Sequence, residues 1–365
     1  MEPESAIPAH LRQERALQPK TPHNYSPPFP AYCARFAEKT KNLAMAVIGA
    51  QFKSVNAESR DSVDILNSFL SPSNCADSPP SFSEMSSFTD RTGFYNIAII
   101  AYWSSSDSYQ RWVDGSGFGS WWTLLNPEEQ THGWFLEVFL PPIERFETVF
   151  SSDTSPEGAA HMQESFSAPI REHGYWGSMR DRLPISQTHT LNGEQARLTC
   201  IQGGTPKVLN ERIKVPGKEN IAVIRSGQDW MSTTESEREL YLTTMNPILV
   251  KGMNFLSDHG REVGCYNCRL MDIIDPATKK ADKDRTFGLA YFDELASLER
   301  WSREHKTHLD IFGGFLKYTK TLDNVITLKL FHEVLVLEPE QQIFEYVCCH
   351  ERTGMLDSWQ GPATQ

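Results

Sequence analysis

The chain has 365 residues, of which 39% are hydrophobic, and a formal net charge of -12 at pH 7. Lys and Arg never gather into a block, so we expect no nucleic-acid partner, because phosphate binding requires a concentrated basic face. No apolar run approaches the roughly 18 residues that span a bilayer. Residues 1–10 are polar, so we expect neither a membrane segment nor a secretory signal.

The seven cysteines are scattered along the chain and odd in number. This pattern is typical of reduced thiols and predicts a cytoplasmic protein. Cys265 and Cys268 form a lone CxxC sequence without a second pair at zinc spacing. We therefore interpret them as strand residues rather than as a metal site.

The order of predicted elements indicates an α+β fold. Seven prolines lie within residues 1–30, so this segment should form an extended arm, along the body of the protein or against a partner subunit. Apolar runs predict strands at residues 44–52, 95–103, 133–140, 221–226, 262–274, 286–292, 325–337 and 343–349. Helical spacing predicts helices at residues 57–70, 105–113, 233–256 and 293–319. Residues 71–92 and 151–172 should be irregular, the first of them a long surface loop.

A weak internal repeat suggests a duplicated architecture. One predicted strand ends at Tyr102 and a helix follows to Trp112, and the same spacing recurs from Tyr291 to Trp301. Two βαβ-type halves of this kind would pack as a ferredoxin-like pair of antiparallel sheets, or as a barrel, flanked by helices. We expect a single domain at residues 31–356, followed by a flexible tail at residues 357–365.

His332 stands in the middle of the predicted strand at residues 325–337. Alternate residues of this strand, from Ile326 to Val336, share one face and are apolar apart from His332. A buried imidazole without a partner costs free energy. We therefore expect His332 to be either a hydrogen-bonded core residue or part of a pocket.

His308 lies on an apolar stripe of the predicted helix at residues 293–319. Spacings of three and four place on one face the residues Leu298, Trp301, His305, His308 and Phe312. The plain interpretation is a semi-buried histidine bonded to a carbonyl near a helix end. The alternative is an imidazole that coordinates a metal or a haem iron. The HExxH spacing of zinc sites is absent, whereas one imidazole in an apolar cavity suits haem.

Three further polar residues stand out. Arg182 ends the run HGYWGSMRDR, where an arginine could form a surface pair with Asp181 or could donate inward to a substrate. Ser226 ends an apolar strand, a usual turn position, and residue 224 is Ile, so the GxSxG elbow of serine hydrolases is absent. Glu147 lies among apolar neighbours, where most glutamates occupy a strand edge that faces water.

Several strings of the sequence together resemble one known family. They are NYSPPFPAY, HGYWGSMRDRLPISQT, NIAVIRSGQDW, the LERW and HKTH segments of the predicted helix, LKLFHEV and QIFEYVCCHERTGML. These strings resemble aldoxime dehydratases, and the resemblance runs from about residue 24 to about residue 356. It implies a lyase with a ferredoxin-like, haem-binding fold that dehydrates aldoximes (R–CH=N–OH) to nitriles and water, usually as a homodimer. The cofactor would be haem b, with ferrous iron that binds the oxime nitrogen.

The resemblance also assigns roles to single residues. The second histidine of HKTH, His308, resembles the proximal haem ligand. His332 of LKLFHEV resembles the distal catalytic histidine, which acts as general acid and base. Ser226 of RSGQDW and Arg182 of RDR resemble the residues that hold the substrate hydroxyl, and Glu147 of FET resembles a distal acid.

Two features depart from the family pattern. Lys306 stands where the HPTH form of the motif has proline, and the connection from His308 to His332 is a few residues longer than in bacterial members. The longer connection affects the alignment of the loop but not that of the two histidines.

Three other functions stay open on the sequence. A haem peroxidase of the dye-decolourising or chlorite-dismutating architecture would use a similar sandwich and one proximal histidine. A haem carrier or sensor would bind the cofactor without chemistry. A cofactor-free monooxygenase of the dimeric α/β-barrel kind fits less well, because it needs no histidine on the stripe that carries His308.

Overall fold

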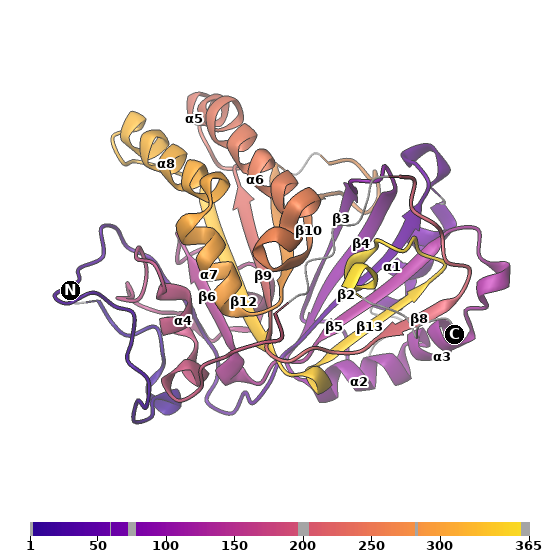
Figure 1. Ribbon diagram of the computed structural model, residues 1–365, viewed down its shortest axis with the longest axis horizontal. Helices are drawn as coiled ribbons and strands as arrows, with labels where there is room; N and C mark the ends of the chain where they lie inside the picture. The colour runs from indigo at the N-terminus through magenta and orange to yellow at the C-terminus, as the bar shows by residue number, and fades with distance from the viewer. Residues whose placement is uncertain (1–2, 59, 72–77, 196–203, 282–283, 359–365) are drawn as a thin grey trace.

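The protein is described by a computed structural model that covers residues 3–58, 60–71, 78–195, 204–281 and 284–358 (Figure 1). Within these residues an eleven-stranded sheet has the order β6-β12-β9-β11-β10-β3-β4-β2-β5-β13-β8. Its neighbouring strands all pair antiparallel. A separate small sheet pairs β1 (Ala34–Arg35) with β7 (Ser165–Phe166). Among the described helices, none combines the length and the apolar character that crossing a membrane requires.

The large sheet contains the same βαββαβ unit twice. The first unit consists of β2 (Ala44–Phe52), α1 (Arg60–Leu70), β3 (Phe82–Thr89), β4 (Tyr95–Trp103), α2 (Ser106–Gly115), α3 (Phe118–Leu124) and β5 (Gly133–Phe139). The second consists of β9 (Ile221–Asp229), α5 (Glu235–Leu240), α6 (Asn246–His259), β10 (Cys265–Ile273), β11 (Arg285–Phe292), α7 (Leu295–Glu304), α8 (Lys306–Thr321) and β12 (Lys329–Leu337). In each unit the strands lie in the order fourth, first, third, second, as in ferredoxin-like folds. The predicted α+β fold with two ferredoxin-like halves is confirmed.

The two halves exchange their outer strands. β6 (Phe146–Phe150) follows β5 in the chain, yet it pairs with β12 of the second half. β13 (Gln342–Val347) follows β12, yet it pairs with β5 of the first half, and β8 (Arg212–Val215) pairs with its free edge. Figure 1 shows the yellow β13 beside the purple strands of the first half and the purple β6 beside β12. Because each half is completed by a strand of the other, the two form one interlocked body.

The hydrophobic core has three layers. The inner faces of both halves meet in one cluster, which includes Val47, Ile100, Leu289 and Leu335. The outer face of the first half packs under α1, α2 and α3 in a second cluster rich in tryptophan. The outer face of the second half packs under α6 and α7, where Leu256, Leu298 and Trp301 cover Ala290 and Val334. The helices in Figure 1 accordingly lie on the outside of each half.

The strand registers show what differs between the halves. In the second half His332 of β12 lies opposite Ser226 of β9. At the equivalent place of the first half, Leu136 of β5 lies opposite Ile48 of β2, and both are buried. The polar pair therefore occurs in one half only, although the backbone is repeated in both.

Short helical turns complete the chain. A five-residue helix, α4, covers Ser178–Arg182, and a π-helical segment at Tyr241–Met245 joins α5 to α6. The 3-10 turns are Ala9–Leu11, Val55–Ala57, Pro127–Glu129, Ile143–Arg145, Gly158–Met162, Pro184–Gln187, Gly260–Val263, Pro339–Gln341 and Gly354–Ser358.

The prediction of a surface loop at residues 71–92 was wrong for half of its described part. Residues 82–89 form β3, which pairs with β4 along its whole length and joins the two halves through β10. Ser86 and Ser87 are buried there, and the Ser86 hydroxyl donates to the carbonyl of Ala98 at 3.2 Å. Because backbone carbonyls can satisfy such hydroxyls, a serine-rich segment can lie inside a sheet. Residues 72–77 lie outside the described part of the chain.

Two predicted helices are interrupted. The predicted helix at 233–256 changes to π-helical hydrogen bonding just before Pro247, which has no N–H to donate and whose ring crowds the preceding turn. The predicted helix at 293–319 is divided at His305, whose backbone is extended and whose side chain caps α8 by accepting from the Thr307 N–H.

Strand β10 begins at Cys265 rather than at the predicted residue 262, after Gly264 in a left-handed conformation.

Candidate active site

His332 and Ser226 face each other on the outer side of the second half. They are directly opposite in the β12–β9 pair, and side chains of opposite residues point to the same face of a sheet. Gly288 of β11 lies on the other side of Ser226 in register. Both polar residues are half-buried, in a strand face that is otherwise covered by α6 and α7. The structure thus places Ser226 inside a strand and not at a turn.

Arg182 and Glu147 form a buried ion pair beside His332. Arg182 Nε donates to Glu147 Oε2 at 2.6 Å, and its terminal nitrogen Nη2 donates to Glu147 Oε1 at 3.0 Å. The two side chains are only 3% and 1% exposed. Glu147 lies on β6, an edge strand, but it points to the same face as His332, because Val149 two residues later is the partner of His332. The interpretation of Glu147 as a water-facing edge residue was therefore wrong.

Arg182 also donates from Nη2 to Nε2 of His332 at 3.0 Å. A guanidinium has no acceptor atom, so the imidazole nitrogen must be the acceptor in this hydrogen bond. The other terminal nitrogen of Arg182, Nη1, donates to the carbonyl of Glu172 at 2.9 Å. The left-handed Gly177 begins α4 and Pro184 follows its end, so Arg182 stands on a short, sharply bounded turn. Glu147, Arg182 and His332 thus form one connected chain of side chains.

Burial and the neighbouring cation keep His332 neutral. Desolvation first, then the Arg182 guanidinium and then His308, lower the pKa of His332 to about 3. Burial raises the pKa of Glu147 from its ordinary value, and the pairing with Arg182 opposes that rise. The site therefore presents a neutral imidazole next to a positively charged arginine whose carboxylate partner is buried with it.

His308 reaches the region from α8, the helix that follows the break at His305. Lys306 occupies the first position of this helix, a position where proline is also tolerated, so the lysine leaves the start of α8 unchanged. Burial lowers the pKa of His308 to about 4, which leaves its ring neutral and able to act as a metal ligand. Its Nδ1 is buried without a well-formed hydrogen bond, although the Ser302 carbonyl lies near enough to oppose the fall in the pKa.

The surroundings of His308 fit a haem. The ring lies 4.9 Å from that of Trp301 and 6.0 Å from that of Trp176, measured between centroids. Trp176 also contacts Phe312, and these two large side chains remain 42% and 39% exposed. Uncovered aromatic surface beside a neutral imidazole is what a porphyrin would cover. Phe312 shares the predicted stripe with the buried Leu298 and Trp301, yet it is itself partly exposed.

The structure brings together the residues that the sequence singled out. His332, Ser226, Arg182 and Glu147 lie on one face of the second half, and His308 is close enough to act on the pKa of His332. Arg180, by contrast, points away and pairs with Glu299 at 2.8 Å.

Sequence reasoning missed two residues near this site. Trp176 contacts the His308 and Phe312 rings, and its position between Gly174 and Gly177 in the HGYWGS run was the signal that could have singled it out. Asp181 was interpreted as a surface partner of an arginine, but it is 2% exposed, and the hydrogen bonds that it accepts come from Lys20, Thr21 and Tyr175.

Comparisons with known proteins agree with this geometry. The profile of the family described as haem-containing dehydratase matches residues 46–355. An aliphatic aldoxime dehydratase of Pseudomonas chlororaphis is 36% identical over 353 residues, which cover 97% of each chain. A phenylacetaldoxime dehydratase of Bacillus sp. (strain OxB-1) is 29% identical over 92% of this chain and 93% of its own.

Solved structures give the same result. The crystal structure of an aldoxime dehydratase, OxdRE, in complex with butyraldoxime superimposes with a TM-score of 0.88 at 34% sequence identity. The match covers 98% of this chain and 97% of the crystallised one. Fold, family profile and full-length relatives agree, and the chain belongs to the haem-containing dehydratase family.

Proposed function

We propose that this protein dehydrates aldoximes to nitriles and water, with a haem held by His308. The observation that carries the proposal is the connected group of Glu147, Arg182 and His332, opposite Ser226 and within electrostatic reach of His308. The relatives named aldoxime dehydratases, which match over nearly the whole chain, support the same reaction. When bound, haem would supply a ferrous iron for the oxime nitrogen and electron density for the N–O bond.

The polar residues supply what the leaving group needs. Hydroxide leaves poorly, so cleavage of the N–O bond requires a proton on the oxygen in the transition state. Arg182 and Ser226 would donate to, and orient, the oxime hydroxyl so that its oxygen lies at hydrogen-bond distance from His332. Glu147 would hold Arg182 in place and offset its charge in the buried site.

Catalysis requires that His332 carries a proton when the N–O bond breaks. A ring with a pKa of about 3 is neutral at pH 7, whereas a general acid must carry a proton. The oxygen of the oxime hydroxyl would accept the hydrogen bond that Arg182 now donates to Nε2 of His332. Nε2, freed of that bond, could then carry the proton that the departing hydroxyl needs. The proton on carbon would return to His332, so a complete cycle consumes none. General acid catalysis of this kind contributes on the order of 10²–10⁴ in rate.

The test uses the full-length, haem-loaded protein, reduced with dithionite under anaerobic conditions. We expect nitrile to form from phenylacetaldoxime or butyraldoxime, measured by gas chromatography. His332→Ala should keep the haem and lose the reaction, whereas His23→Ala, at an exposed histidine of the N-terminal segment, should match the unaltered protein. Reduced, haem-loaded protein that forms no nitrile would refute the proposal, as would dye bleaching by peroxide that outpaces aldoxime turnover.

We also propose that the protein is a homodimer, which the family resemblance implies. The chain has a mass of 41.5 kDa. Sedimentation equilibrium of the haem-loaded protein should give twice that value at micromolar concentration. A mass of one chain would contradict this part of the proposal.

A further inference from the structure

Residues 4–25, the part of the predicted N-terminal arm to which the word arm refers from here on, are bound to the segment that carries Arg182. Glu4 forms a parallel bridge with Ile170, and the Ala6 N–H donates to Glu172 Oε2 at 2.7 Å. Farther along, the N–H groups of residues 16 and 17 donate to the carbonyl of Gln187. Figure 1 shows the indigo arm beside α4 at one end of the molecule. The arm thus follows residues 169–187, the segment that includes α4.

Asp181 connects the arm to α4 through side-chain hydrogen bonds. Its carboxylate accepts from the Lys20 N–H at 2.9 Å and from the Thr21 hydroxyl at 3.1 Å. The Tyr175 hydroxyl donates to the same carboxylate at 2.7 Å. Asp181 is 2% exposed and directly precedes Arg182. Because one short turn carries both residues, fixing Asp181 on the arm fixes the backbone from which Arg182 reaches Glu147 and His332.

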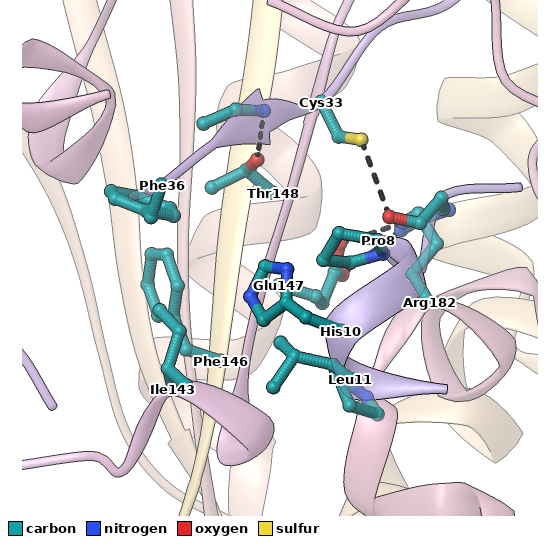
Figure 2. Close-up of a pocket in the computed structure, with 13 residues that line it drawn as sticks. Pro8, His10, Leu11, Cys33, Phe36, Ile143, Phe146, Glu147, Thr148 and Arg182 are labelled. Atoms are coloured by element: carbon teal, nitrogen blue, oxygen red, sulfur yellow. Dashed lines mark hydrogen bonds and ion pairs between the residues drawn. The ribbon is translucent and has the colours of Figure 1, made fainter. Parts of the chain in front are cut away.

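The arm also lines a cavity beside the ion pair. This cavity of about 40 Å³ is lined by Ala6, Pro8, His10 and Leu11 of the arm and by Glu147 and Arg182. Figure 2 shows His10 and Leu11 from the arm across this cavity from Phe146 and Ile143. A cavity of this volume holds only a few water molecules. With the arm in place, the charges of Glu147 and Arg182 are therefore shielded from bulk solvent and act more strongly on His332.

We propose that the contacts of the arm with Asp181 hold the active site in place and that Asp181 is a positioning residue, which through the arm keeps Arg182 on Glu147 and His332. This inference rests on the proposed function, since it concerns the residues that would hold the oxime hydroxyl. It assigns Asp181 no contact with the substrate. Loss of its carboxylate should let α4 shift and Arg182 withdraw from His332, whereas His308 keeps its place on α8.

The test compares Asp181→Asn with Glu14→Gln, which alters an exposed carboxylate of the same arm. In Asp181→Asn we expect unchanged haem binding, a fall of tenfold or more in kcat and a change of less than threefold in KM. Glu14→Gln should match the unaltered protein. The second readout is the C–O stretching frequency of the reduced carbon monoxide complex, which responds to cations near the bound gas. Asp181→Asn should shift it in the same direction as Arg182→Met.

A milder variant keeps the proposal testable if Asp181→Asn does not fold. Thr21→Val removes one hydrogen bond to Asp181 and should shift the C–O frequency in the same direction by a smaller amount. Hydrogen exchange should also become faster in residues 4–25 of both variants. An unchanged frequency together with kcat within twofold of the unaltered protein would overturn the inference. Absence of nitrile formation by the unaltered protein would instead count against the proposed function.

Discussion

Replacing Glu147 by Gln should destabilise the protein and reduce its activity together. The Glu147–Arg182 pair is almost completely buried, and Arg182 would keep only neutral partners, among them the Glu172 carbonyl. Removing one member of a buried ion pair leaves an uncompensated charge, which typically costs about 3–5 kcal/mol of unfolding free energy. The magnitude follows from the lost partner and not from packing, because Gln has nearly the volume of Glu.

Urea unfolding of the haem-free protein measures this cost, since bound haem would add its own binding free energy to the folded state. The double variant Glu147→Leu with Arg182→Met serves as the control. It removes both charges, so it should recover most of the stability that Glu147→Gln loses, and it should still be inactive. A loss below about 0.5 kcal/mol in Glu147→Gln, the usual range of surface substitutions, would refute the reasoning. So would a double variant that is as unstable as the single one.

Three further predictions concern the polar residues around His332. His332→Ala should keep a normal haem spectrum and reduce kcat by about 10²–10⁴-fold; kcat within threefold of the unaltered value would remove His332 from the mechanism. Ser226→Ala should reduce kcat/KM about 5–15-fold, as expected for one hydrogen bond of about 1–1.5 kcal/mol, and an unchanged kcat/KM would show that the hydroxyl is not used. Arg182→Met should raise the pKa of His332 from about 3, because a nearby cation that disfavours the charged ring is removed. NMR titration of the haem-free protein measures this pKa, and an unchanged or lower value would show that the Arg182 charge does not depress it.

The sequence predicted the repeated architecture because apolar patterning and the Tyr-to-Trp spacing are local signals. The equal spacing after Tyr102 and Tyr291 corresponds to two strands, β4 and β11, that occupy the same position in their halves. Patterning did not reveal β3, because Ser86 and Ser87 are polar in sequence but buried inside the sheet. The strand exchange was also beyond sequence reasoning, because nothing local indicates that β6 pairs with β12 rather than with β5.

The candidate site was predictable in its residues but not in its connections. His308 and His332 stand out as polar members of apolar faces, and the family resemblance adds Ser226, Arg182 and Glu147. That Arg182 donates to His332 and pairs with Glu147 depends on contacts across 150 and 35 residues of sequence, respectively. The neutral state of His332 depends on the same contacts, so it required the structure. The anchoring of Asp181 by the arm lies at a similar sequence distance and was missed for that reason.

The most direct test of His308 as the haem ligand is the absorption spectrum after loading with hemin and removal of unbound cofactor. His308→Ala is compared with His305→Asn, which alters the neighbouring histidine and keeps a residue able to cap α8. We predict that His305→Asn retains the Soret band of the unaltered protein and that His308→Ala loses it. A normal, protein-bound Soret band in His308→Ala would contradict the assignment of His308 as the haem ligand.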